Sequence, residues 1–121
     1  MKMQAVLAAA GCVFGACGVA AAAAGAHLTN LPNLPVAAQF LLIHAVAIVG
    51  LAALSAAFGG RKLVAWSAVV LAVGVVLFSG SLIWSDVFGA SPMSSLAPVG
   101  GTTLIVGWLF AAVAALSLAR R

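Results

Sequence analysis

The sequence predicts an all-α membrane protein: one domain of four transmembrane helices in an antiparallel bundle, with both termini in the cytoplasm. Of its 121 residues, 66% are hydrophobic and 5% are charged. A soluble domain carries about 25% charged residues, so this chain could not cover a water-exposed surface. A disordered chain is excluded because the sequence is far too apolar. The uncharged runs are long and continuous, which favours helical spans over the alternating strands of a membrane barrel.

Four runs are long enough to cross a hydrocarbon layer of about 30 Å, and each ends at a recognisable boundary. The predicted spans are 3–26, 36–58, 63–85 and 97–119. Pro32 and Pro35 separate the first two. Gly59 and Gly60 predict a tight hairpin with positive φ before the third. A polar segment over 86–96 ends the third span, and Pro98 suits the first turn of the fourth.

The positive residues set the orientation. Lys2, the pair Arg61–Lys62 and the pair Arg120–Arg121 all fall on one side of a four-span chain, whereas the acidic Asp86 falls on the other. The positive-inside rule therefore places both termini in the cytoplasm. Without a basic stripe, the net charge of +4 does not indicate a nucleic-acid partner.

The N-terminal run also has the look of a cleavable signal peptide, with Lys2 before an apolar stretch rich in alanine. Without this span, the positive residues would no longer be distributed as expected for a four-span chain. We therefore expect the first span to be retained.

Small residues predict how the helices associate. In lipid, helices pack through faces of Gly and Ala that allow close approach. The candidate packing residues are Gly11, Gly15, Gly18, Gly74, Gly80, Gly100, Gly101 and Gly107. The first span is almost entirely Ala and Gly, so we expect it to be buried in the bundle or pressed against a partner. That partner would be another membrane protein or a second copy of the chain.

The two helix hairpins also resemble each other, since the segment after Pro35 is similar to the segment after Pro98 and this register aligns His44 with Gly107. Either a duplicated hairpin or a chance likeness of two Pro-started helices explains this.

Polar side chains inside a membrane are functional hypotheses by default, and here most fall in the outer half of the bilayer. The candidates are His27, Gln39, His44, Ser79, Ser81, Asp86, Thr102 and Thr103. One interpretation is a polar pocket open to the outer face with His44 as its floor. The other, which we favour, is hydrogen bonding between helices. His27 suits the end of the first span, where it would interact with the helix C-terminus.

The sequence predicts no cofactor, no metal site and no catalysis. His27 and His44 differ in depth by about 13 Å at 1.5 Å per residue, whereas a bis-histidine haem needs both at one depth. Cys12 and Cys17 lie on different faces of one helix, which disfavours a disulfide and a metal site. No serine has a nucleophile-elbow context, and mid-membrane carboxylates are missing.

Several segments together resemble the family numbered 423 among the domains of unknown function. They are Gly25–Leu28, His44 within Phe-Leu-Leu-Ile-His-Ala, Leu77–Leu82, Pro98–Gly101 and Gly107–Trp108. This family comprises small bacterial inner-membrane proteins and a mitochondrial relative in animals. The resemblance covers nearly the whole chain and implies four spans, but no established activity. The segment between the first two spans is shorter here than in many relatives.

Two functions follow as hypotheses. The first is a non-enzymatic accessory or assembly subunit of a larger inner-membrane complex. The second is a binding or transport protein whose outer-facing pocket holds a small molecule, a quinone or an ion. They differ in geometry: a pocket requires His44, Ser79 and Ser81 to face one cavity, whereas a subunit would have them hydrogen-bonded within the chain.

Overall fold

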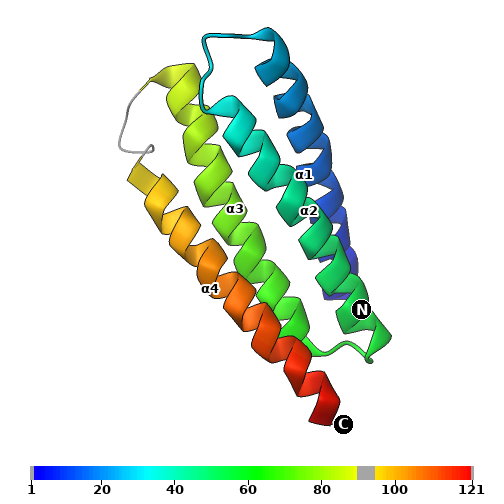
Figure 1. Ribbon diagram of the computed structural model, residues 1–121. Coiled ribbons are helices and arrows are strands. Elements are labelled where there is room, and N and C mark those ends of the chain that lie inside the picture. The colour runs from blue at the N-terminus through cyan, green and yellow to red at the C-terminus, as the bar shows by residue number, and fades with distance from the viewer. Residues whose placement is uncertain (1, 90–94, 121) are drawn as a thin grey trace.

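Four long helices and a short 3₁₀ turn account for almost the whole chain in the computed structural model, which describes residues 2–89 and 95–120 (Figure 1). The helices are α1 (Lys2–His27), α2 (Leu34–Ala57), α3 (Lys62–Phe88) and α4 (Leu96–Leu116), and η2 covers Ser117–Arg120. All four are long and apolar enough to cross a membrane. The four-span fold predicted from the sequence is confirmed.

The helices follow one another as an open antiparallel array. The main packed pairs are α1 with α2, α2 with α3 and α3 with α4, with a smaller contact between α1 and α3. The core lies along α2 and α3, around Leu41, Ile48, Ala68, Leu71 and Val75. Leu7 from α1 and Leu104 from α4 complete it from the two sides.

Helix α1 lies at one edge of this array, and most of its side chains are exposed. The expectation that the first span is buried within the bundle is therefore wrong for the chain by itself. Its Ala and Gly side chains are small and fill little of a core, so the larger residues of α3 occupy the centre instead. The alternative, that α1 is pressed against a partner, stays a prediction.

The connection between α2 and α3 is a tight hairpin. Gly59 and Gly60 have φ of 75° and 81°, as predicted, a region that a side chain with a Cβ adopts at a cost. The N–H groups of Gly60 and Arg61 both donate to the carbonyl oxygen of Ser55. These bonds satisfy one of the free carbonyl groups at the end of α2.

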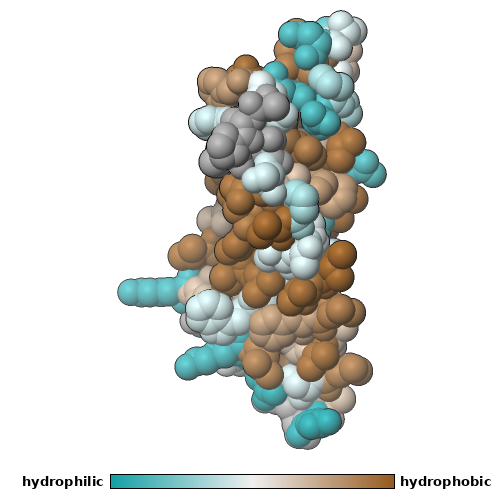
Figure 2. Space-filling model, turned by 90° about the vertical axis from the view of Figure 1, so that its left-hand side faces the viewer, coloured by the Kyte–Doolittle hydropathy of each residue, from teal (hydrophilic) through white to brown (hydrophobic). Residues whose placement is uncertain are grey.

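Both ends of the chain and this hairpin lie at one end of the array (Figure 1). Lys2, Arg61 and Arg120 therefore gather at that end, while His27 and Asp86 lie at the other. Apolar surface covers much of the length in between, with hydrophilic residues toward the two ends (Figure 2). The positive-inside rule places the end with the cations in the cytoplasm.

The third helix runs one turn further than the predicted span, to Phe88, and Gly89 follows it with φ of 83°. The rest of the predicted polar connection, residues 90–94, lies outside the described residues.

Candidate functional site

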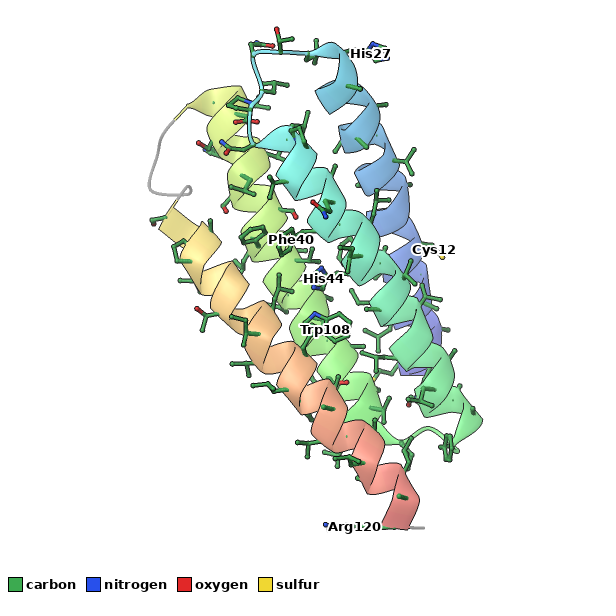
Figure 3. The ribbon with its side chains drawn as sticks, in the orientation of Figure 1. Cys12, His27, Phe40, His44, Trp108 and Arg120 are labelled. Atoms are coloured by element: carbon green, nitrogen blue, oxygen red, sulfur yellow. The ribbon has the colours of Figure 1, made fainter. Side chains whose placement is uncertain are left out.

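His44 lies at the centre of a polar contact between α2 and α4. Its Nδ1 is 2.7 Å from the carbonyl oxygen of Phe40, one turn earlier. A carbonyl oxygen only accepts, so Nδ1 carries a proton and is the donor. Its other nitrogen, Nε2, accepts a hydrogen bond of 3.1 Å from Nε1 of Trp108 (Figure 3). Both ring nitrogens are thus occupied, and the residue is only 4% exposed.

Aromatic rings surround this contact. Phe40 stacks on His44 with 5.7 Å between ring centroids, and Phe78 of α3 lies 4.4 Å from Phe40. The Trp108 ring is 5.9 Å from the imidazole. The cluster joins α2, α3 and α4 near the middle of the array.

The two predicted serines of α3 are buried and hydrogen-bonded to backbone. Ser79 is 1% exposed, and its hydroxyl donates to the carbonyl oxygen of Ala37 on α2 at 2.9 Å. Ser81 donates to the carbonyl oxygen of Phe78 in its own helix at 2.8 Å. Neither bonds to His44. Ser79 therefore joins α2 to α3, whereas the hydrogen bond of the Ser81 hydroxyl stays within α3.

The remaining polar residues are spread over the outer surface. Thr102 and Thr103 donate to the carbonyl oxygens of Pro98 and Val99 in their own helix and line an open hollow of about 330 Å³. Gln39 is exposed and lines another, between α1 and α2. His27 is exposed at the end of α1, well away from His44 (Figure 3).

Asp86 makes a two-point contact that the sequence did not reveal. Its Oδ2 accepts from the backbone N–H of Asn33 at 2.9 Å, and its Oδ1 accepts from Asn33 Nδ2 at 2.8 Å. Asn33 directly precedes α2. A carboxylate at a helix N-terminus also interacts favourably with the helix dipole. Asp86 thereby ties the α1–α2 connection to the end of α3.

A second polar contact lies at the opposite, cytoplasmic end. Gln4 Nε2 donates to Ser55 Oγ at 2.9 Å, and Ser55 Oγ donates to the carbonyl oxygen of Arg61 at 2.9 Å. Gln4 is 7% exposed, and its Oε1 is buried with no hydrogen-bond partner. Gln4 is the only amide side chain within the predicted first span, and this feature of the sequence would have identified it as a candidate polar contact.

The glycines predicted for packing differ in how closely a neighbouring helix approaches them. At five of them a Cβ would come within 3.0 Å of a neighbouring helix: Gly11, Gly18, Gly74, Gly100 and Gly107. The first two face α2 from α1, and the other three lie between α3 and α4. Gly15 and Gly101 have only ordinary contacts, and Gly80 has no neighbour within 4 Å.

Among the described residues, the predicted polar side chains are not gathered around one hollow. The most pronounced hollows on the described part of the surface are open and hold about 250 to 420 Å³ each, and His44, Ser79 and Ser81 do not line these hollows. Across residues 2–89 and 95–120, no three His, Cys, Asp or Glu residues lie together as metal ligands would. Cys12 and Cys17 are both free and exposed.

Four apolar helices, cations at one end and polar contacts that close within the chain define a small multi-pass membrane protein. Comparison with known proteins gives the particular family. The profile described as protein of unknown function DUF423 matches residues 14–101, and the chain belongs to this family. The resemblance found in the sequence is confirmed, and the protein is placed in the bacterial inner membrane.

Its relatives carry names that describe location only. The chain is 36% identical over 85 residues to the UPF0382 inner membrane protein YgdD of Escherichia coli K12, which covers 69% of this chain and 63% of the relative. It is 32% identical over 77 residues to the UPF0382 membrane protein YwdK of Bacillus subtilis, covering 64% of this chain and 63% of the relative. The chain thus spans less than two thirds of these relatives. No solved structure matches significantly.

Proposed function

We propose that the protein is a non-enzymatic accessory or assembly subunit of a larger inner-membrane complex, joined to another membrane protein or to a second copy through its Gly and Ala helix faces. One observation carries this proposal: both ring nitrogens of His44 are occupied within the chain, by the Phe40 carbonyl oxygen and by Trp108. The residue best suited to ligand or proton chemistry is thereby used to join helices.

The hypothesis of an outer pocket receives less support from this geometry. Ser79 and Ser81 donate to backbone carbonyl groups, and Thr102 and Thr103 do the same within α4. A ligand would have to break these bonds before it could use the hydroxyl groups. Breaking each hydrogen bond costs free energy, and binding in a weakly polar pocket would not offset this cost.

Co-purification from native membranes tests the proposal. The tagged chain would be extracted in a mild detergent, captured and analysed by mass spectrometry for proteins and small molecules together. We expect at least one other integral membrane protein in stoichiometric amount. Recovery of the chain by itself, with a small molecule retained in stoichiometric amount, would contradict the proposal and favour the pocket.

His44→Ala separates the two functions further. In a subunit it lowers the stability of the bundle and leaves any associated protein bound, provided that the fold survives. Trp66→Ala is a matched control, since Trp66 is exposed on α3 and lies at the opposite, cytoplasmic end. Loss of a co-purifying small molecule in His44→Ala only would favour the pocket instead.

A further inference from the structure

The cytoplasmic end of the array carries basic residues that have no acidic side chain near them. Lys2 begins α1, and Arg61 and Lys62 lie where the α2–α3 hairpin meets α3. Asp86, the only acidic side chain of the sequence, lies near the opposite end of α3. Hydrophilic side chains project from the surface near the cytoplasmic end (Figure 2). Acidic side chains of the protein therefore do not neutralise the positive charge at this end.

A buried chain of hydrogen bonds holds two of the basic segments together. Gln4 Nε2 donates to Ser55 Oγ, which in turn donates to the carbonyl oxygen of Arg61. Ser55 is completely buried, and Gln4 follows Lys2 by two residues, about half a turn of α1. This contact brings the start of α1, with Lys2, to the hairpin that carries Arg61 and Lys62.

An apolar seam runs from these basic residues into the membrane between α1 and α3. An open hollow of about 280 Å³ lies on this seam and is lined by Phe14, Ala72, Val73, Val76 and Leu77. On α3, Lys62, Trp66 and Val73 follow one another at spacings of four and seven residues, which places them on one helix face. Trp66 is 52% exposed and Val73 is 49% exposed. One face of α3 thus leads from a basic residue to the apolar hollow.

The depth of the hollow suits the acyl chain of a lipid. Phe14 lies twelve residues after Lys2, and Val73 lies eleven residues after Lys62. Both separations correspond to about 17–18 Å along a helix at 1.5 Å per residue, and half of a hydrocarbon core is about 15 Å thick. A lipid with its headgroup at the basic residues would therefore place the end of an acyl chain at the hollow.

We propose that the α1–α3 seam binds an anionic phospholipid of the cytoplasmic leaflet. Its phosphate lies at Lys2, Arg61 and Lys62, and one acyl chain lies along the seam as far as the hollow. Basic side chains form charge-assisted hydrogen bonds with phosphate oxygens, and basic residues at the cytoplasmic surface attract anionic lipids. This inference goes beyond the proposed function and does not depend on it.

Other occupants fit the seam less well. A second copy in the same orientation would bring its own cations to the same depth beside Lys2 and Lys62, where like charges repel. A lipid with a neutral headgroup would add a cation of its own to the basic group. A soluble phosphate ion would meet the cations but leave the apolar seam uncovered.

Quenching of tryptophan fluorescence by brominated lipids tests the proposal. Trp66 lies on the seam face of α3, whereas Trp84, which is 40% exposed, lies near the outer end of the same helix. Full-length chains with only Trp66 (Trp84→Phe, Trp108→Phe) or only Trp84 (Trp66→Phe, Trp108→Phe) would be reconstituted in phosphatidylcholine vesicles. Brominated phosphatidylglycerol and brominated phosphatidylcholine would then be compared at equal mole fractions. Both reporter chains carry Trp108→Phe, so they differ only in which tryptophan remains.

We expect phosphatidylglycerol to bind beside Trp66 at least about five-fold more strongly than phosphatidylcholine, which is the effect of one basic residue near an anionic headgroup. Beside Trp84 it should have no such advantage, because Asp86 is close by. Equal quenching of Trp66 by the two lipids would overturn the proposal. Weak quenching of Trp66 by both would mean that a second copy covers the seam, and would overturn it as well.

Charge variants of the Trp66 reporter test which cations attract the lipid. Lys2→Gln and Lys62→Gln should each reduce the preference for phosphatidylglycerol by about half or more, since each removes one of the cations near the phosphate. Arg120→Gln is the matched control. Arg120 is equally exposed at the cytoplasmic end, but it follows α4, at the opposite edge of the array from α1 (Figure 1). A loss in Arg120→Gln as large as in the other two variants would refute the site, because net charge would then explain the preference.

Inorganic phosphate separates a lipid from a soluble anion. Added at constant ionic strength, it should leave the preference at Trp66 unchanged, because a lipid is also held by its acyl chain. A preference that inorganic phosphate abolishes would assign the basic residues to a soluble anion and overturn the proposal.

Discussion

At the scale of single residues, hydrogen bonds decide what the polar side chains of this protein do. His44 is neutral because Phe40 supplies an acceptor to Nδ1 and Trp108 supplies a donor to Nε2. Protonating Nε2 would place two N–H groups against each other. The pair therefore joins α2 to α4 only while the imidazole is neutral.

Trp108→Phe tests this contact. The change keeps an aromatic ring against His44 and removes the N–H group. We expect the free energy of unfolding in detergent to fall by about 0.6 kcal/mol, the average for hydrogen bonds between membrane helices, and by no more than about 1.7 kcal/mol. Trp66→Phe, at an exposed position on α3, should change it by much less. Equal effects of the two changes would argue against a stabilising Trp108–His44 bond.

Asp86 and Asn33 provide a second test. Asp86→Ala leaves both the backbone N–H and the Nδ2 of Asn33 without their acceptor. A hydrogen bond to a charged group contributes about 1.5–3 kcal/mol, and partial exposure places this pair toward the lower end. Asn33→Ala removes only the Nδ2 bond and should cost less. Thermal unfolding of both variants gives the comparison, and the reverse order would contradict the two-point contact.

At the scale of helices, the closeness with which two backbones can approach determines how the helices pack. Gly100 rests directly against α3, where a Cβ would lie 2.7 Å from the Cα of Phe78. Its neighbour Gly101 would place a Cβ 3.7 Å from the Phe78 ring, an ordinary contact. Gly100 therefore sets the distance between α3 and α4, whereas the adjacent Gly101 does not.

Gly100→Ala should therefore separate α3 from α4 and lower the free energy of unfolding by about 1–3 kcal/mol, as for other overpacked cores. Gly101→Ala should be neutral or slightly stabilising, since alanine favours helix more than glycine does. Urea or thermal unfolding in detergent micelles measures both. A loss in Gly101→Ala that matched the loss in Gly100→Ala would show that close backbone approach is not the cause.

At the scale of the whole molecule, the cations determine how the array sits in the membrane. Cysteines introduced into a chain with Cys12→Ala and Cys17→Ala report on this. Thr29→Cys, in the α1–α2 connection, should react with an impermeant thiol reagent added outside intact cells. A cysteine appended after residue 121 should react only after permeabilisation, because the positive-inside rule keeps that end in the cytoplasm. Neither change removes a Lys or Arg, and labelling of the appended cysteine from outside would refute the orientation.

The contact between His44 and Trp108 could have been predicted from the sequence, because α2 and α4 run in the same direction. The likeness of the two hairpins aligns His44 with Gly107, and both helices run toward the cytoplasm. Trp108 therefore lies at nearly the depth of His44, and the register predicts a pair there. The partner of Asp86 could not be found this way, because Asn33 lies in a connection whose path depends on how α2 meets α3.

The sequence by itself determined the class of the protein, the number of spans, their approximate ends and their orientation. Each of these depends on local properties: twenty apolar residues span a bilayer, glycines allow a tight hairpin, and Lys and Arg stay on the cytoplasmic side. The tertiary structure decided which helix faces meet. It placed α1 at the edge, paired His44 with Trp108 and left Gln4 Oε1 buried without a hydrogen-bond partner. Helices that are apolar all round carry no marked face, so the match of side-chain shapes across the interfaces selects among their possible arrangements.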